Sequence, residues 1–373
     1  MPMTRILQFG TSRFLQAHAC LFAHEANVAG DGPVAVTVVK GTPDAGRAGR
    51  VAALADPDGY PVRLRGLQAG KAVDGQVTVR AVKAALALPQ DWAALGDVFV
   101  TGTDAVISNT GDTGYAEMPG DLAAIADPRQ CPAGFPARLT ALLLRRWQAG
   151  GSGLPIYPCE LISGNGDVLR GVIDAMALRA GLPPAFRDWL GREVHFANSL
   201  VDRIVSEPIE PAGAVAEPYA LWAIGAPGLA PFAHPSIVVV PDLEPLERLK
   251  LHLLNLSHTV LAERWLQGAS ADLTVQAALA LPLWREMLLE VVHGEVLPGF
   301  AWRGMAGPAR DYLATTMERF DNPFLDHRLS DIAQNHPAKV QRRIGGFLDW
   351  VAGGGLSMPL LRDIHDRRRA HDC

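Results

Sequence analysis

The residues best suited to catalysis are three polar side chains in a leucine-rich run, Lys250, Asn255 and His258. At about 100° per residue in an α-helix they fall at roughly 0°, 140° and 80°, on less than half of the circumference. Leucines lie on nearly every other side, and a helix that is apolar all round is buried. Burial lowers the pKa of a lysine from about 10.4 toward neutrality, as a general base working near pH 7 requires.

A structural interpretation of this helix stays open. A lysine can reach the surface along its apolar stem, and His258 can be a hydrogen-bonded core histidine. Because three polar groups converge on one face, we favour a site, with Lys250 as the proton-transfer residue.

Two further polar segments follow apolar stretches. The segment from Pro158 to Asp167, which contains Asn165, opens a helix at the carboxyl edge of a predicted sheet, where α/β proteins bind ligands. The segment from Asn198 onward places Asp202 beside Arg203. Each alone is also compatible with a helix cap or a surface ion pair.

The elements that position these residues begin with a β-turn-α-β unit, with strands at 5–9 and 34–39 and a helix at 14–28. The turn occupies the place of the glycine-rich loop of a dinucleotide-binding fold. The turn has only one glycine, since Ser12 occupies the position where the second glycine is expected. An ordinary βα turn that binds no cofactor is therefore the alternative. The residues of this turn are Gly10, Thr11, Ser12, Arg13 and Phe14.

The end of the second strand bears on the choice of cofactor. An acid there would bind the adenosine ribose and favour NAD. Here the strand leads into Lys40, and Asp44 comes four positions later. Lys40, Arg47 and Arg50 could instead meet the 2′-phosphate of NADP, or they could be solvated loop charges.

The chain of 373 residues is too long for one ordinary core, since cores stop growing at roughly 250 to 300 residues. We predict an α/β Rossmann-like dinucleotide-binding domain over residues 1–244 and an all-α domain over residues 245–373. Further strands are predicted at 77–82, 98–100, 105–108 and 154–159, with a helix at 136–149. The predicted helices of the second domain are 246–267, 275–292, 309–320, 323–334 and 338–351.

The composition excludes several classes of protein. The net charge is −5, and the basic residues are scattered apart from Arg367–Arg369. The sequence therefore has no cluster of basic residues typical of nucleic-acid binding. The four cysteines, Cys20, Cys131, Cys159 and Cys373, have no zinc-site spacing, so no metal is predicted. No leader is visible, and no stretch reaches the roughly 18 to 20 apolar residues that span a bilayer, so we expect a cytoplasmic protein.

Six motifs occur together and in order: ILQFGTSRFLQAH near the N-terminus, VISNTGDTGY at 106–115, PCELISGNGD at 158–167, NSLVDRI at 198–204, KLHLLNLSH at 250–258 and RFDNPFLDH at 319–327. Together they resemble the long-chain polyol and sugar-acid dehydrogenases, the family of mannitol dehydrogenase and of the tagaturonate and fructuronate reductases. The PCELI form is closer to the tagaturonate reductases.

This resemblance implies a metal-independent oxidoreductase in which Lys250 is the general acid/base. It implies that Asn255 and Asn165 polarise the reacting oxygen, and that His258 and Asp202 orient the substrate or the lysine. Mannitol dehydrogenase has two asparagines near Asn165, and this chain has Leu161 at the other position. The candidate substrate-binding residues are Asp202, Arg203 and Lys339. The candidate cofactor-binding residues are the turn at 10–14, Lys40, Ser108, Asn109 and Thr110.

The expected cofactor is NAD, with NADP as the alternative, and the expected assembly is a monomer or a homodimer. The leading substrate pair is a hexuronate ketone and its aldonate, such as tagaturonate and altronate, and a neutral polyol and its ketose are the alternative. A carboxylate would need a fixed cation, for which Lys339, Arg342 and Arg343 are candidates unless they form a solvated basic face. A non-catalytic nucleotide-binding sensor would be expected to lose Lys250 or Asn255, and both are present.

Overall fold

The computed structural model describes residues 2–42, 48–111, 114–268 and 272–371 of the chain. It divides into two compact units. The first comprises Met1–Leu64, Gly75–Ala216 and Ala220–Leu243. The second comprises Arg65–Asp74, Glu217–Tyr219 and Glu244–Cys373. Two short segments that precede residue 244, Arg65–Asp74 and Glu217–Tyr219, therefore group with the helical unit.

A six-stranded parallel sheet forms the centre of the first unit, in the order β5-β2-β1-β6-β7-β8. Its strands are β1 Thr4–Phe9, β2 Val34–Lys40, β5 Val82–Ala87, β6 Ala105–Ser108, β7 Pro155–Pro158 and β8 His195–Phe196. The chain leaves β1 toward β2 on one side and later returns to β6 on the other. The carboxyl end of β1 is thus a topological switch point, the place where open α/β sheets bind ligands. The predicted Rossmann-like fold class is confirmed.

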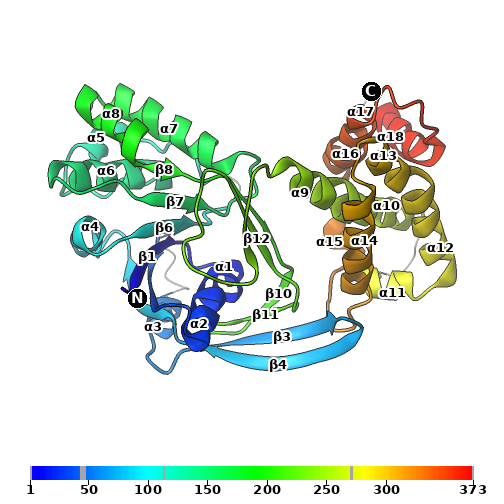
Figure 1. Cartoon of the computed structure of the whole chain (residues 1–373), viewed down its shortest axis with the longest axis horizontal. Coiled ribbons are helices and arrows are strands. Elements are labelled where there is room, and N and C mark those ends of the chain that lie inside the picture. Colours follow the sequence, from blue (N-terminus) through cyan, green and yellow to red (C-terminus); the bar gives the residue numbers. More distant parts are fainter. Residues whose placement is uncertain (1, 43–47, 112–113, 269–271, 372–373) are drawn as a thin grey trace. The chain divides into compact units, whose positions relative to one another are not determined.

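Helices cover both faces of this sheet (Figure 1). They are α1 Arg13–Ala17, α2 Ala19–Ala29, α3 Ala48–Leu54, α4 Trp92–Thr101, α5 Asp121–Ile125, α6 Phe135–Gln148, α7 Asn165–Arg179 and α8 Pro184–Glu193. Side chains alternate along β1, so Ile6 lies in the core that contains α1 and α2, whereas Leu7 and Phe9 lie in the core that contains α4 and α6 to α8. The two cores fix the carboxyl ends of the strands.

Two smaller sheets complete the first unit, in the orders β10-β11-β3-β4 and β13-β12-β9. Their strands are β3 Tyr60–Gln68, β4 Lys71–Val79, β9 Ser199–Asp202, β10 Val205–Pro208, β11 Ala214–Ala216, β12 Leu221–Gly225 and β13 Ile237–Val240. The tip of the β3–β4 hairpin belongs to the second unit. The sequence prediction missed this hairpin, because charged residues such as Arg63, Arg65 and Asp74 weaken the apolar pattern of its strands.

Two predicted strands of the first unit need correction. The strand predicted at 77–82 is divided between the end of β4 and the start of β5. The prediction of a strand at 98–100 is wrong, because these residues end α4, in which Leu95 and Phe99 are fully buried. A short apolar run does not distinguish a strand from a buried helix.

Three π turns interrupt the helices of the second unit: η2 Lys250–Asn255, η3 Val292–Val296 and η4 Gln341–Gly345. The helices are α9 Glu244–Leu249, α10 Leu256–Leu266, α11 Val275–Leu279, α12 Pro282–Val291, α13 Leu297–Trp302, α14 Ala306–Phe320, α15 Leu329–Ile332, α16 His336–Val340, α17 Gly346–Trp350 and α18 Pro359–His371. The helix predicted at 323–334 is mostly wrong. Only α15 is helical there, and the side-chain carbonyl of Asn322 accepts the Phe324 N–H at 3.0 Å within a loop.

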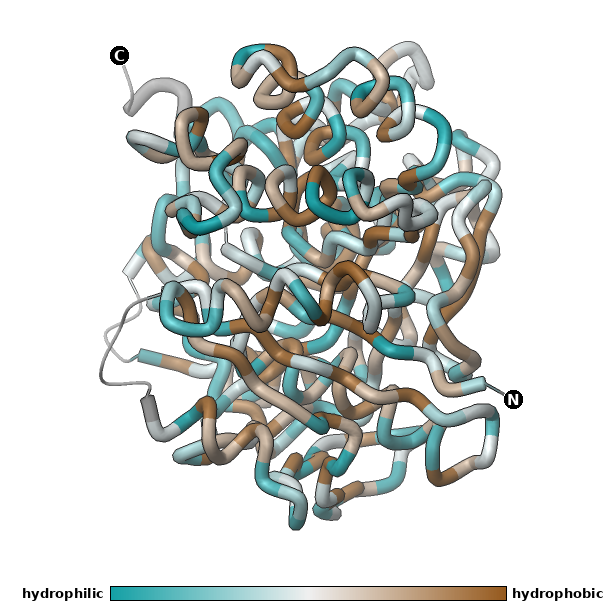
Figure 2. Tube along the Cα trace, turned by 90° about the vertical axis from the view of Figure 1, so that its left-hand side faces the viewer, coloured by the Kyte–Doolittle hydropathy of each residue, from teal (hydrophilic) through white to brown (hydrophobic). Residues whose placement is uncertain are grey.

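Hydrophobic residues are interleaved with hydrophilic ones along the chain (Figure 2). Among the helices of residues 2–42, 48–111, 114–268 and 272–371, none is long and apolar enough to cross a membrane.

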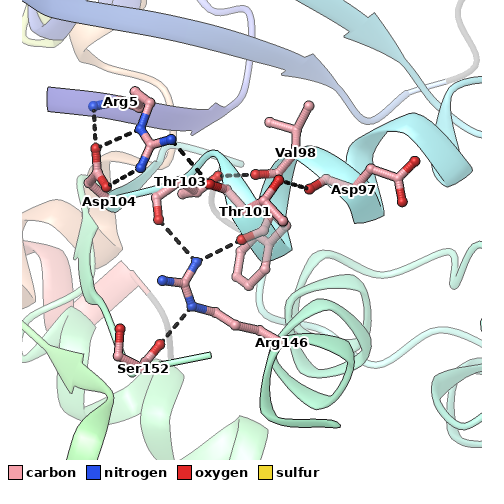
Figure 3. A network of polar contacts seen from close by, with 9 residues as sticks. Arg5, Asp97, Val98, Thr101, Thr103, Asp104, Arg146 and Ser152 are labelled. Carbon is pink, nitrogen blue, oxygen red and sulfur yellow. Dashed lines mark hydrogen bonds and ion pairs between the residues drawn. The ribbon is translucent and has the colours of Figure 1, made fainter. Parts of the chain in front are cut away.

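The amino-terminal edge of the main sheet is held by a polar network around Arg146 (Figure 3). Arg146 donates to the carbonyls of Phe99, Thr103 and Ser152 at 2.7, 3.0 and 2.7 Å. Nearby, Arg5 forms a 2.8 Å ion pair with Asp104, just before β6. These contacts join the starts of strands, at the edge opposite the switch point, so we regard them as structural.

Candidate active site

The first turn is built around Gly10. Its φ of +117° suits only glycine, and a Cβ there would lie 2.6 Å from the Asn109 carbonyl oxygen. Ser12 caps α1, because its hydroxyl accepts the Leu15 N–H at 3.2 Å. The position expected to carry a second glycine therefore serves as a helix cap.

A cavity of about 490 Å³ opens at the carboxyl ends of β1, β2 and β6. Its volume is in the usual range for a small-molecule or cofactor site. Of the predicted cofactor residues, the cavity is lined by Gly10, Thr11, Ser12, Asn109 and Thr110. Sequence reasoning missed Gly41 and Arg138, which also line it. The Arg138 guanidinium donates to the Gly41 carbonyl at 3.0 Å, and this contact between α6 and the end of β2 has no local sequence signal.

Other predicted cofactor residues do not line this cavity. Arg13 donates to the Ser206 carbonyl at 3.0 Å, and Phe14 stacks on His18. Lys40 is buried at the end of β2. Arg50 forms a 3.0 Å ion pair with Glu210. Asp44 and Arg47, like Cys373, lie outside the described residues.

A buried carboxylate, Glu160, fixes the loop that follows β6. It accepts hydrogen bonds from the Ser108 hydroxyl at 3.1 Å, from the Thr110 N–H and hydroxyl at 3.0 Å each, and from the Tyr115 hydroxyl at 3.0 Å. Burial, and then the negative charge of Glu160, raise the pKa of Tyr115, so its phenol remains a donor. The predicted residue Ser108 thus contacts Glu160 and does not line the cavity. Glu160 itself was not predicted from the sequence.

Asn165 is fully buried, and its amide is used entirely by the backbone. Its Nδ2 donates to the carbonyls of Pro158, Glu160 and Ser199 at 2.9 to 3.1 Å. Its Oδ1 accepts the N–H groups of Gly166 and Ser199 at 2.9 Å each. This geometry leaves no donor for a substrate oxygen, in contrast to the expected polarising role. The side chain joins the end of β7 to the start of β9.

Leu161, which stands at the other asparagine position, is 66% exposed. Asp202 ends β9 and is buried. Arg203 is also buried, donates to the Ala17 carbonyl and lies over the Phe22 ring at 5.8 Å. These contacts tie Arg203 to the core of the first unit.

In the second unit, Lys250 and Asn255 are the first and last residues of the π turn η2. The single α-helix predicted over 246–267 is therefore three elements, α9, η2 and α10. A π turn bonds residue i to i+5 and takes more residues per turn than an α-helix. Asn255 consequently lies closer to the direction of Lys250 than the α-helical 140° would place it. Both side chains are partly exposed.

His258 is buried one turn further on, against the rings of Phe320 and His327, each 4.7 Å away between centroids. Burial, and then the neighbouring His327, hold the pKa of His258 well below its ordinary value. Burial also lowers the pKa of His327 to about 4. Both imidazoles are therefore neutral near pH 7. Sequence reasoning missed His327, although it ends the RFDNPFLDH motif.

The three predicted cations occupy different environments. Arg342 is exposed. Arg343 donates from Nη1 to the Asn255 carbonyl at 3.2 Å and to the Thr259 hydroxyl at 3.0 Å. Lys339 donates to the Ile332 carbonyl at 2.8 Å. Burial, and then the positive charge of Arg343, lower the pKa of Lys339.

Across residues 2–42, 48–111, 114–268 and 272–371, no group of three or more His, Cys, Asp and Glu side chains is arranged to hold a metal ion.

A parallel sheet of this order, with a glycine turn and a cavity at its switch point, defines a Rossmann-type dinucleotide-binding protein. More specifically, the chain belongs to the mannitol dehydrogenase family, since residues 4–231 match the family model described as the mannitol dehydrogenase Rossmann domain. The chain is therefore an oxidoreductase of the dehydrogenase type.

Two relatives are altronate oxidoreductases. That of Halalkalibacterium halodurans is 31% identical over 382 residues, which cover 94% of this chain and 72% of the relative. That of Bacillus subtilis is 30% identical over 368 residues, which cover 91% of this chain and 73% of the relative.

Two solved structures share the fold. One is a D-sorbitol dehydrogenase in substrate-free form, with a TM-score of 0.81 at 18% identity over 98% of this chain and 82% of that one. The other is the Pseudomonas fluorescens mannitol 2-dehydrogenase ternary complex with NAD and D-mannitol, with a TM-score of 0.76 at 19% identity over 98% and 79%.

Proposed function

We propose that the protein is an NAD-dependent, metal-independent oxidoreductase that interconverts a secondary alcohol and a ketone on a sugar acid, with altronate and tagaturonate as the leading pair. The observation that carries this proposal is the π turn with Lys250 and Asn255 at its two ends and the neutral His258 one turn beyond. The relatives named altronate oxidoreductases support the substrate class.

The cavity at the switch point suits a dinucleotide. The missing Cβ of Gly10 lets its backbone lie close to the Asn109 carbonyl at the cavity wall. Thr11, Ser12 and Thr110 provide polar groups beside it. We propose that these residues hold NAD. When bound, the nicotinamide supplies a carbon that accepts or donates the hydride.

In this proposal the proton is handled by Lys250. During oxidation the neutral amine of Lys250 accepts the proton of the substrate hydroxyl, and during reduction the ammonium returns it to the ketone oxygen. The Asn255 amide donates to the same oxygen and stabilises its partial charge. The neutral His258 can accept a hydrogen bond from a neighbouring substrate hydroxyl, since its Nε2 has no partner within the part of the chain that the structure describes.

For the remaining predicted residues we propose narrower roles. Asn165 positions the loop after β7 and does not touch the substrate. Asp202 and Lys339 remain proposed substrate-binding residues, and Arg203 is proposed to support Asp202. We also propose that the protein works in the cytoplasm, as a monomer or a homodimer.

A panel assay tests the proposed function. Altronate, tagaturonate, mannitol, sorbitol and fructose are supplied with NAD or NADP in the appropriate oxidation state, and the absorbance of the reduced cofactor is followed. The proposal expects turnover of the acids with NAD to be at least tenfold more efficient than that of the neutral sugars. Turnover confined to polyols would favour the polyol alternative, and binding without any turnover would favour a nucleotide-binding sensor.

A further inference from the structure

Two π turns of the second unit are bonded to each other through Arg343. Its backbone carbonyl, in η4, accepts a hydrogen bond from Nδ1 of His252, in η2, at 3.0 Å. Its side chain returns to the carboxyl end of η2, where Nη1 donates to the Asn255 carbonyl at 3.2 Å and to the Thr259 hydroxyl at 3.0 Å. The guanidinium is thus held at a fixed position beside the backbone of the proposed catalytic Asn255.

These contacts use only one of the three guanidinium nitrogens. Within the described ranges, Nε and Nη2 of Arg343 make no hydrogen bond to the protein, and the side chain forms no ion pair with a carboxylate. The edge formed by Nε and Nη2 matches the two oxygens of a carboxylate, because a guanidinium donates two parallel hydrogen bonds. Since Nη1 is already anchored, this edge is oriented before any ligand arrives.

Among the groups around Arg343, Asp331 is the carboxylate whose charge reaches this cluster, where it acts on His327. Lys339 is close enough for the charge of Arg343 to lower its pKa, and in the described structure it also forms no ion pair with a carboxylate. The third nearby cation, Arg319, is paired with the buried Glu217 through contacts of 2.8 and 3.0 Å. His258 and His327 are neutral near pH 7, as described above. Two partly buried positive charges therefore lie together, an arrangement that is costly alone and favourable with a bound anion.

We propose that Arg343, with the charge of Lys339 in support, binds the carboxylate of the sugar-acid substrate through its Nε and Nη2 edge. This makes Arg343 a specificity-determining residue that selects acids over neutral polyols. The inference rests on the proposed function, because it assigns the substrate carboxylate to a place beside Asn255. Among the three predicted cations, Arg343 is preferred because Arg342 is exposed and Lys339 presents no two-pronged edge.

The test compares altronate with its amide, which keeps every hydroxyl and loses the charge. With NAD as cofactor, kcat/KM is measured for both compounds on the wild type and on Arg343→Gln, Arg343→Lys and Arg342→Gln. Arg343→Gln should lower kcat/KM for altronate about 10²-fold, the value of a charge-assisted paired contact. The kcat/KM for the amide should change by less than about threefold, because the amide has no negative charge to pair with Arg343. The kcat/KM of Arg343→Lys for altronate should lie between the values of the wild type and of Arg343→Gln.

Arg342→Gln is the matched control, since it removes the same charge from the neighbouring residue of the same π turn. It should leave the ratio of acid to amide efficiency unchanged. An equal loss for acid and amide in Arg343→Gln would overturn the inference, because it would show that the side chain only positions Asn255. If Arg343→Gln does not fold, Arg343→Lys decides, since retention of the full wild-type ratio would also overturn it. A wild type that oxidises neither compound would instead refute the proposed function.

Discussion

Lys250 and Asn255, the two residues proposed to act on the reacting oxygen, are the first and last residues of one π-helical turn. Both are partly exposed, whereas the residues between them include the buried His252, Leu253 and Leu254. The buried side chains fix the turn in the core of the helical unit, and the two polar side chains leave it. The proposed proton-transfer group and the proposed oxyanion donor therefore extend from the same turn.

For Lys250→Ala we expect kcat to fall by about 10² to 10⁴-fold, the usual contribution of a positioned proton-transfer group. The KM for NAD should change little, because the cofactor cavity is built from the first unit. Steady-state oxidation of altronate measures both quantities. A small amine added to the buffer should restore part of the rate. Near-normal turnover in a folded variant would show that the lysine is structural.

The neutral histidines of the helical unit should make stability depend on pH. Burial lowers the pKa of His252 and of His327 to about 4, below the value of about 6.5 in the unfolded chain. Between these values the unfolded chain binds protons that the folded chain does not. The free energy of unfolding should therefore fall as the pH drops from about 6.5 to about 4, by up to about 1.4 kcal/mol per pH unit for each histidine.

Urea denaturation between pH 4 and 8 measures this slope. His327→Gln should flatten it, because one buried imidazole is removed, whereas the exposed His293→Gln should leave it unchanged. Equal slopes for the wild type and His327→Gln would contradict the burial argument.

At the scale of elements, Asn165 makes five hydrogen bonds to the backbone, three of which join the strands β7 and β9. It lies at the start of α7 and bonds to the end of β7 and the start of β9. Glu160, two residues after β7, similarly bonds the loop that follows β6. The carboxyl edge of the sheet is thus held together by buried polar side chains on neighbouring loops.

Asn165→Ala should lower the free energy of unfolding by on the order of 2 to 4 kcal/mol, because buried carbonyl and N–H groups lose their partners. Asn255→Ala should instead leave stability near the wild-type value and lower kcat. Urea denaturation and steady-state kinetics on both variants separate the two roles. A stable Asn165→Ala protein with lost turnover and unchanged KM would return this amide to the catalytic set.

The sequence was sufficient for elements with a strong period and insufficient for contacts made at long range. The β1-turn-helix-β2 unit, β6 and α6 follow from apolar spacing. Lys250, Asn255 and His258 are selected by their place among leucines, and their catalytic role stays a prediction. The π turn η2 was not predictable, because its residues also suit an α-helix. Arg138, Glu160 and His327 were missed because each acquires its neighbours only through tertiary packing. The backbone hydrogen bonds of Asn165 have no sequence pattern, so its structural contacts are not predictable from the sequence.

At the scale of the whole molecule, the candidate chemistry uses the amine of Lys250 and the amide of Asn255 rather than a metal. Activity should therefore persist within about twofold after exhaustive dialysis against a chelator, since the described residues contain no cluster that could hold a metal ion. The measurement is kcat with altronate and NAD before and after treatment. Loss of activity that zinc restores would end the lysine mechanism.

The division of the chain into two units determines which parts of this protein can be expressed or exchanged separately. Arg319, near the C-terminal end of α14, takes its buried partner Glu217 from the three-residue segment Glu217–Tyr219, and the guanidinium also lies over Tyr219 at 4.4 Å. Asn322 likewise bonds to the Arg65 carbonyl in the hairpin tip at 3.2 Å. A gene fragment starting at residue 244 would encode a helical bundle in which the buried Arg319 has lost its contacts with Glu217 and Tyr219. The helical half therefore cannot be transferred alone. Recombination between relatives has to exchange Arg65–Asp74, Glu217–Tyr219 and Glu244–Cys373 together.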